Sequence, residues 1–99
     1  MRVTLAESAL EDLQDILEWH AEQGVPETGE RLVDALLLKI EHLQQYPDMG
    51  RMVPEFSQPW LREIIHSPYR IVYRRDVECV RIVRILRAER LLRLPGDDD

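Results

Sequence analysis

The stretch from Tyr69 to Arg87, YRIVYRRDVECVRIVRILR, decides the fold. It predicts two strands joined by a turn at residues 76–78, because β-branched and aromatic residues alternate with arginines on either side of that turn. The hairpin carries six arginines and only two acids, both of which lie at the turn. A guanidinium group offers a fixed fork of donors that suits carboxylates and phosphates. We therefore expect the function to depend on what this pair of strands binds.

Further strands are predicted on the N-terminal side of the hairpin. Residues 60–66 (WLREIIH) predict a strand that Ser67-Pro68 connects to the hairpin, and residues 2–6 (RVTLA) predict a short first strand. The intervening residues 47–59 are rich in Pro, Gly, Asp and Ser, which is typical of a long connection. Residues 88–94 are expected to form a short helix or an extended segment, and the acidic tail at 96–99 is expected to be mobile.

Two helices are predicted in the first half of the chain. Residues 8–11 read S-x-x-E, a capping-box signature, and apolar residues then follow helical spacing as far as Gly24. Pro26 fits the first position of a second helix, which is expected to stop at Pro47. Because about three residues separate the two helices, we expect them to form an antiparallel hairpin.

The predicted fold class is α+β, with the element order β-α-α-β-β-β in a single domain spanning residues 1–95. The helix hairpin is expected to pack on one face of an antiparallel sheet, leaving the other face partly open for a partner or ligand. A chain of 99 residues buries one modest core and leaves no room for a separate cofactor domain.

The net charge of −6 is distributed unevenly. Residues 1–50 carry three basic and eleven acidic residues, whereas residues 51–99 carry ten arginines and eight acids. The acidic half argues against direct, non-specific DNA binding by this chain alone. Cytoplasmic localisation is expected, because no apolar run is long enough to span a bilayer, the N-terminus has no signal-peptide block, and the lone Cys79 fits a reducing compartment.

The candidate binding residues are arginines on the strands and in the segments beside them. They are Arg51, Arg62, Arg70, Arg74, Arg81, Arg84, Arg87 and Arg90. No cofactor or metal is predicted, because the three histidines and Cys79 lack metal-ligand spacing and there is no Gly-rich phosphate loop. Trp19 is expected to pack beside the apolar stripe of the first helix.

Several segments stand in the order and spacing of a known family. They are PETGERLVDALLLKIEHLQQYPDMGR (26–51), GRMVPE (50–55), LREI (61–64), YRIVYR (69–74) and VRIVRIL (80–86). On these segments the chain resembles the ParE branch of the RelE/ParE superfamily, the toxins of bacterial type II toxin–antitoxin pairs, over nearly its whole length. The resemblance implies two antiparallel helices on an antiparallel sheet.

The resemblance also implies a function and partners. ParE-like members inhibit DNA gyrase, RelE-like members cut messenger RNA on the ribosome, and both are silenced by a small antitoxin that wraps around the toxin. We therefore expect a ParD-like antitoxin, a hetero-oligomer with it, and contact with DNA only through that antitoxin. An amphipathic antitoxin helix is expected in the groove between the helix hairpin and the sheet, with antitoxin acids on the arginine-bearing strands.

The choice between gyrase inhibition and RNA cleavage rests on the chemistry of the sheet. RelE-like enzymes use lysines and arginines there, often with a histidine or tyrosine near the end of the last strand. Here Lys39 is the only lysine and lies on a helix, and Arg87 stands where many relatives have histidine. Arginine stays protonated, which makes it a poor general acid or base. We expect a gyrase-binding inhibitor with no catalytic residue.

Two alternatives remain open. A ribosome-dependent endoribonuclease is the first, with an acid–base set drawn from Glu63, His66, Tyr69 and Tyr73. The second is a toxin fold that has lost its toxicity and acts only as a binding partner.

Overall fold

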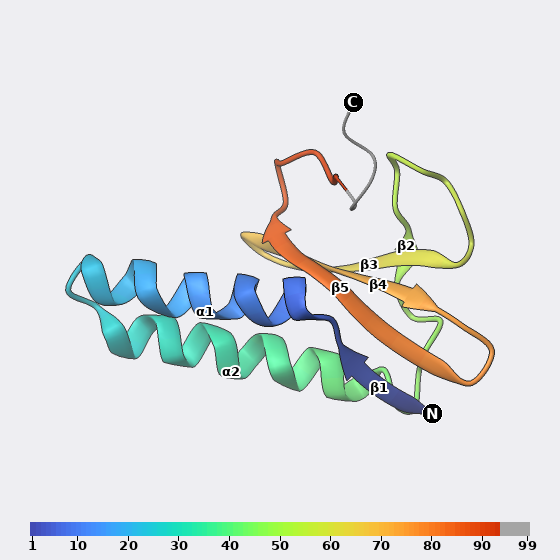
Figure 1. Ribbon diagram of the computed structural model, residues 1–99, viewed down its shortest axis with the longest axis horizontal. Helices are drawn as coiled ribbons and strands as arrows, with labels where there is room; N and C mark the ends of the chain where they lie inside the picture. The colour runs from blue at the N-terminus through green and yellow to red at the C-terminus, as the bar shows by residue number, and fades with distance from the viewer. Residues whose placement is uncertain (94–99) are drawn as a thin grey trace.

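The computed structural model describes residues 1–93 and confirms the α+β class, with two helices and a five-stranded sheet (Figure 1). In chain order the elements are β1 (Arg2–Leu5), α1 (Glu7–Glu22), α2 (Pro26–His42), β2 (Arg51–Met52), β3 (Leu61–His66), β4 (Tyr69–Arg75) and β5 (Cys79–Arg87). The predicted tail at 96–99 lies outside the described residues. Within the described residues, neither helix is both long and apolar enough to cross a membrane.

The sheet has the strand order β1-β5-β4-β3-β2. Strands β2 to β5 pair antiparallel, as predicted, but β1 pairs parallel to β5, so the sheet is mixed and the expectation of a fully antiparallel sheet was wrong. A tight turn fixes the direction of each hairpin strand, whereas β1 meets β5 from the far end of the chain. The two-residue strand β2, which pairs with β3 inside the predicted connection 47–59, was not predicted.

The helix hairpin forms as predicted, but α1 begins differently from the sequence prediction. The residue before α1 is Ala6, and no side chain caps the helix. The Ser8 hydroxyl instead donates to the carbonyl oxygen of Val83 at 2.6 Å, so the predicted capping box does not form and Ser8 ties α1 to β5. Gly24 adopts a φ of 81° just after α1, and Pro26 starts α2 as predicted.

The main core lies between the helix hairpin and one face of the sheet, which we call the helix face. The two helices lie on the same side of the sheet, below β3, β4 and β5 in the view of Figure 1. The fully buried side chains of the main core include Leu36 on α2 and Leu43 directly after α2. They also include Ile71, Tyr73 and Ile82 on β4 and β5. Burying an aliphatic side chain of this size contributes about 1.5–3 kcal/mol, so this core supplies most of the stability.

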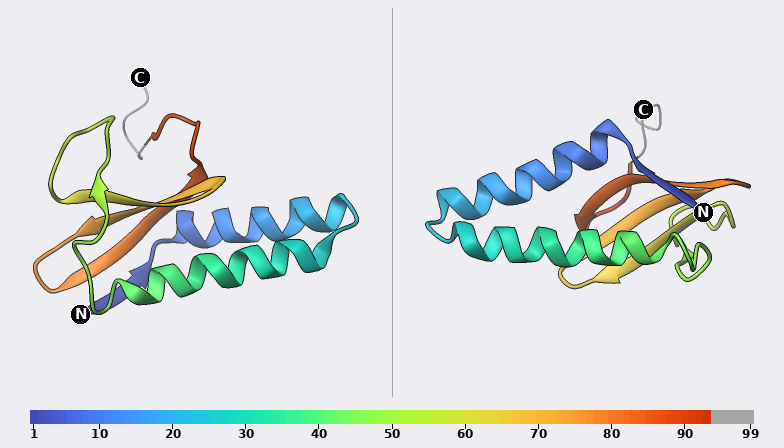
Figure 2. Two further views of the ribbon diagram at one scale, coloured as in Figure 1. Left: turned by 180° about the vertical axis from the view of Figure 1, so that it is seen from behind. Right: turned by 90° about the horizontal axis from the view of Figure 1, so that it is seen from below.

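A second, smaller core covers part of the opposite face of the sheet, which we call the second face. Val72 on β4 and Leu86 on β5 pack there with Leu61, Val53 and Leu92. Val53 belongs to the segment after β2, and Leu92 belongs to the segment after β5; both segments lie on the side away from the helices (Figures 1 and 2). The chain itself therefore covers one part of the face that was expected to be open.

Tyr73 joins the segment before β2 to the main core. Its buried hydroxyl accepts a hydrogen bond from the Gly50 backbone N–H at 3.0 Å and donates to the Pro47 carbonyl oxygen at 2.8 Å. Gly50 has no room for a side chain, since a Cβ there would lie 2.7 Å from both the Glu63 carbonyl oxygen and the Tyr73 hydroxyl. This close approach explains why glycine stands at position 50.

We predict that Gly50→Ala lowers the free energy of unfolding by about 1–3 kcal/mol, because the added methyl group must displace backbone or the buried tyrosine. Urea denaturation of the isolated chain measures the change. The double variant Gly50→Ala/Tyr73→Phe should lose less than the sum of the two single changes, since removing the hydroxyl relieves one of the three contacts shorter than 3.0 Å that a Cβ at position 50 would make. A Gly50→Ala variant as stable as the unaltered chain would contradict this packing.

Candidate functional site

The arginine at position 70 is buried on the second face of the sheet and holds two carboxylates. Its side chain is only 5% exposed. One guanidinium nitrogen, Nη1, donates to Glu63 Oε1 at 2.8 Å and to Glu55 Oε1 at 3.0 Å. The other, Nη2, donates to Glu55 and to the carbonyl oxygen of Arg90. Both terminal nitrogens of Arg70 are therefore used inside the chain.

The same network extends to β2 and to the segment after β5. Glu63, whose side chain is fully buried, also accepts from Arg51, with the closest nitrogen at 2.7 Å. The other carboxylate, Glu55, accepts the backbone N–H of Leu92 at 2.8 Å. The network thus fixes both segments that cover the second face.

Arg70 corrects one sequence prediction. It was expected to offer its guanidinium to a partner, and the strand alternation did place it on the correct face of β4. The structure instead covers that position, because Glu55 and the backbone after β5 close over it. A buried charge needs internal partners, and Arg70 has them.

The protonation of Glu55 reflects this pairing. Hydrogen bonding to the Arg70 guanidinium is the main cause that lowers the pKa of Glu55 from 4.5 to about 2, with the Leu92 N–H adding to it. In turn, the hydrogen bond to Glu55 raises the pKa of Arg70 above its usual value. Both groups stay charged at every physiological pH.

Two further candidate arginines hold the fold together. Arg84 forms a two-pronged ion pair with Asp12 on α1 at 2.8 and 3.1 Å, and this hydrogen bonding raises the pKa of Arg84. Asp12 also accepts the Ile85 N–H, so it anchors the helix to β5. Arg62 donates to the carbonyl oxygens of Gly50 and Pro59 at 2.9 Å each. Arg62 and Arg84 are therefore engaged in contacts within the chain that stabilise the fold.

Two candidate arginines line a groove where the helix hairpin meets the sheet. Arg87, half-exposed beside Glu89, and the exposed Arg90 lie at this groove. Its apolar lining includes Trp19, Leu32 and Tyr69. Trp19 is 56% exposed, so the expectation that it packs beside the apolar stripe of the first helix was wrong; its ring stands edge-on to the neighbouring His20. The groove thus combines exposed aromatic surface with cationic groups.

The remaining candidates, Arg51, Arg74 and Arg81, are exposed on the second face or at its edge. Arg51 keeps 64% of its side chain exposed despite its bond to Glu63. Arg74 lies 5.8 Å from the ring centre of Trp60, which is a cation–π contact. These side chains can reach a partner without unfolding any part of the chain.

The residues proposed for an acid–base set do not come together. Glu63 is buried in the ion pairs of the second face, whereas Tyr73 lies in the main core on the helix face. The Tyr73 hydroxyl is engaged with Gly50 and Pro47, and burial raises its pKa. Only His66 and Tyr69 are neighbours, as cross-strand partners at the other end of β4. Among residues 1–93, no group of three or more His, Cys, Asp or Glu side chains could hold a metal ion.

Comparison with known proteins agrees with this arrangement. A family described as "ParE toxin of type II toxin-antitoxin system, parDE" matches residues 3–92. The chain belongs to the ParE toxin family. It is therefore the toxin component of a type II toxin–antitoxin system, and the resemblance inferred from the sequence is confirmed.

A solved structure and the curated proteins give two further results. The chain is similar in fold to a structure titled "Chromosomal ParDE TA system from P. aeruginosa", with a TM-score of 0.76 and 24% sequence identity. That similarity covers 90% of this chain and 97% of the other. No curated protein matches the sequence closely enough to add to the family assignment.

The pKa of Glu55 gives a prediction about acid stability. Because the pKa falls from 4.5 to about 2 on folding, the ionised carboxylate stabilises the folded chain fully above pH 4.5. That contribution is lost as the pH falls towards about 2. Glu55→Gln should lower the free energy of unfolding at neutral pH. It should also make that free energy fall less steeply between pH 4.5 and about 2. Chemical denaturation at a series of pH values measures it.

Glu89→Gln is the matched control for that experiment. It removes a carboxylate that also pairs with an arginine, Arg87, but both side chains are at least half exposed. Solvent screens such a pair, so its loss should change the pH profile much less. Equal effects of the two substitutions would contradict a special role for the buried network.

Proposed function

We propose that this toxin acts in the cytoplasm by binding DNA gyrase and inhibiting it, without breaking a bond itself. The observation that carries the proposal is that the described residues offer surfaces for binding but do not assemble the proposed acid–base set. Exposed arginines and an aromatic groove are available for binding, whereas Glu63 and Tyr73 of the possible acid–base set are buried in contacts within the chain, away from His66 and Tyr69. RNA cleavage needs a positioned acid and base, and gyrase inhibition needs only a complementary surface.

The proposal includes a ParD-like antitoxin that forms a hetero-oligomer with this chain and through which any contact with DNA is made. The groove lined by Trp19, Leu32 and Tyr69 suits the apolar face of an amphipathic helix. Arg87 and Arg90 at the same groove suit acids on the edge of such a helix.

The proposed gyrase surface uses exposed arginines and the segment 87–94, of which the structure describes residues 87–93. Arg90 is exposed, and the neighbouring Leu91 has 71% of its surface exposed. The backbone on both sides is held in place, since the Arg90 carbonyl oxygen accepts from Arg70 and the Leu92 N–H donates to Glu55. A segment held in this way presents its side chains at low cost in conformational entropy.

Expression of the chain without its partner tests the function. We expect filamentous cells with damaged DNA and continuing translation, and we expect the purified chain to inhibit supercoiling by gyrase. An immediate stop in translation with cut messages, while supercoiling is unaffected, would overturn the proposal in favour of a ribonuclease. Harmless expression would favour the other alternative, a toxin fold that has lost its toxicity and acts only as a binding partner.

The groove makes a separate prediction about antitoxin binding. Trp19→Ala should weaken antitoxin binding at least about 10-fold, because exposed tryptophans in a groove are frequent binding hot spots. Leu38→Ala on α2 is the matched control: Leu38 is similarly exposed, at 59%, but does not line the groove. Isothermal titration calorimetry measures both. Equal affinities for the two variants would show that the antitoxin does not use this groove.

A further inference from the structure

The groove between the helix hairpin and the sheet has the size and the mixed lining of a small-molecule site. The end of α1, the start of α2, the start of β4 and the end of β5 all contribute to it. Its volume of about 620 Å³ falls within the range of roughly 300–1,000 Å³ that is usual for pockets that hold small ligands. The chemistry of its walls therefore indicates what such a ligand would be.

Two aromatic rings stand in the groove without being taken up by the core. The Trp19 side chain is 56% exposed, and its ring plane makes an angle of 82° with that of His20. Tyr69, on the helix face of β4, is only partly buried. Every nucleobase has a flat π-face that can stack on an exposed aromatic side chain. The two rings thus suit a flat aromatic ligand.

Two guanidinium groups lie beside these rings. Arg87 is the cross-strand partner of Tyr69, so their Cβ atoms are about 4.5–5.5 Å apart on the same face of the sheet. Arg90 follows three residues later, is exposed and lines the same groove. The pair that Arg87 forms with Glu89 is at least half exposed on both sides, so solvent screens it and an anionic ligand can replace Glu89.

The His20 ring is fixed in the wall of the groove with one nitrogen left to accept. Its Nδ1 lies 2.7 Å from the Ile16 carbonyl oxygen, and because a carbonyl oxygen only accepts, Nδ1 donates there. In the neutral ring, Nε2 then carries the lone pair. Gly29 makes room for this side chain, since a Cβ at position 29 would lie 2.8 Å from the His20 Cβ. His20 therefore offers a positioned acceptor to a ligand with an N–H group.

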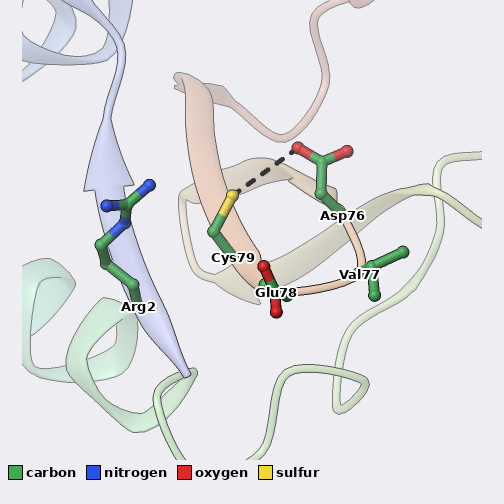
Figure 3. Close-up of a pocket in the computed structure, with 5 residues that line it drawn as sticks. All are labelled: Arg2, Asp76, Val77, Glu78 and Cys79. Atoms are coloured by element: carbon green, nitrogen blue, oxygen red, sulfur yellow. Dashed lines mark hydrogen bonds between the residues drawn. The ribbon is translucent and has the colours of Figure 1, made fainter.

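The surface pocket at the β4–β5 turn lacks this combination. Figure 3 shows Arg2, Asp76, Val77, Glu78 and Cys79 around it, with the Cys79 thiol directed at the Asp76 carboxylate, 3.8 Å away. None of the described residues that line it is aromatic, and its two acids repel a phosphate. Of these two pockets, only the groove combines aromatic rings with guanidinium groups.

We propose that the groove is a binding site for a free nucleotide. The base stacks on Trp19 and Tyr69, and the phosphate binds Arg87 and Arg90. A guanidinium suits phosphate because its planar fork donates to two oxygens at once. His20 Nε2 accepts from an N–H of the base. This site goes beyond the proposed function, since it depends neither on gyrase nor on the antitoxin.

A nucleotide uses parts of the lining that an apolar helix face leaves without partners. Such a helix covers the rings and Leu32, but its apolar side chains bring no donor to His20 and no partner to the Thr28 hydroxyl. A nucleic acid strand has the same base and phosphate, but the net charge of −6 on the chain opposes its long row of phosphates. A free nucleotide brings its charge only to the arginines.

Tryptophan fluorescence tests the site directly. Trp19 and Trp60 are the two tryptophans of the chain, so Trp60→Phe leaves only the one in the groove. Titration of this variant with adenosine 5′-monophosphate (AMP) should change the Trp19 fluorescence and reach saturation. We expect AMP to bind at least about 10-fold more tightly than adenosine or ribose 5-phosphate, because each of these lacks one of the two groups that the groove recognises. AMP that binds no more tightly than ribose 5-phosphate would overturn the proposed stacking.

Two double variants with the same change in charge, both made in the Trp60→Phe chain, locate the phosphate. Arg87→Gln/Arg90→Gln should bind AMP at least about 10-fold more weakly and adenosine equally well, because only the phosphate contacts are lost. Arg74→Gln/Arg81→Gln is the matched control, since it removes two exposed arginines that do not line the groove, and its affinity for AMP should change less than about 2-fold. Equal losses in the two variants would overturn the site.

Urea denaturation separates a binding role from a structural one. Because solvent screens the Arg87–Glu89 pair and the Arg90 side chain is exposed, Arg87→Gln/Arg90→Gln should unfold at nearly the same urea concentration as its parent. Weaker AMP binding by an equally stable chain would support the inference. A large loss of stability would contradict it, since the two arginines would then serve the fold.

Further outcomes separate this site from the proposed function. No saturable change in Trp19 fluorescence with AMP would overturn the nucleotide site and leave gyrase inhibition and the antitoxin untouched. A single-stranded hexanucleotide that binds more tightly than AMP would overturn the free nucleotide in favour of a nucleic acid strand. AMP binding that leaves antitoxin affinity unchanged would support the nucleotide site and exclude the groove as the seat of the antitoxin helix.

Discussion

The buried guanidinium of Arg70 is the interaction on which the second half of the structure depends. Moving a charge out of water is costly, and breaking such a pair by removing one partner costs about 3–5 kcal/mol. Hydrogen-bonded ion pairs with Glu63 from the neighbouring strand and Glu55 from the segment after β2 offset that cost for Arg70. Glu55 then holds the backbone of Leu92, so three distant parts of the chain are fixed around one side chain.

This constraint divides the second face of the sheet into two parts with different uses. Around Arg70 the face is closed by the chain itself, with Leu92 completing a small apolar core. Towards the β4–β5 turn the face stays accessible, and there Arg74 and Arg81 oppose each other. On the helix face, the groove beside Trp19 offers a surface of another kind. A toxin that works by binding needs surfaces of this sort and no assembled acid–base site.

Local patterns in the sequence predicted most elements but not the contacts between distant segments. Helical spacing, Gly24 and Pro26 placed the helix hairpin, and strand alternation placed β3, β4 and β5. The parallel pairing of β1 could not be predicted, because no turn links it to β5. Arg70 and Arg74 have the same alternation on one strand, yet one is buried and the other exposed. That difference depends on Glu55 and the backbone after β5, whose positions no periodicity reveals.

Hydrogen exchange at the Leu92 amide tests the role of the Arg70 network most directly. In the isolated chain we expect this amide, which donates to Glu55, to exchange slowly although it lies beyond the last strand. In Glu55→Gln its protection should fall sharply, while amides of the main core such as Ile82 keep theirs. Exchange of Leu92 in the unaltered chain at the rate of an unstructured peptide would contradict the account, because the segment after β5 would then not be held on the sheet.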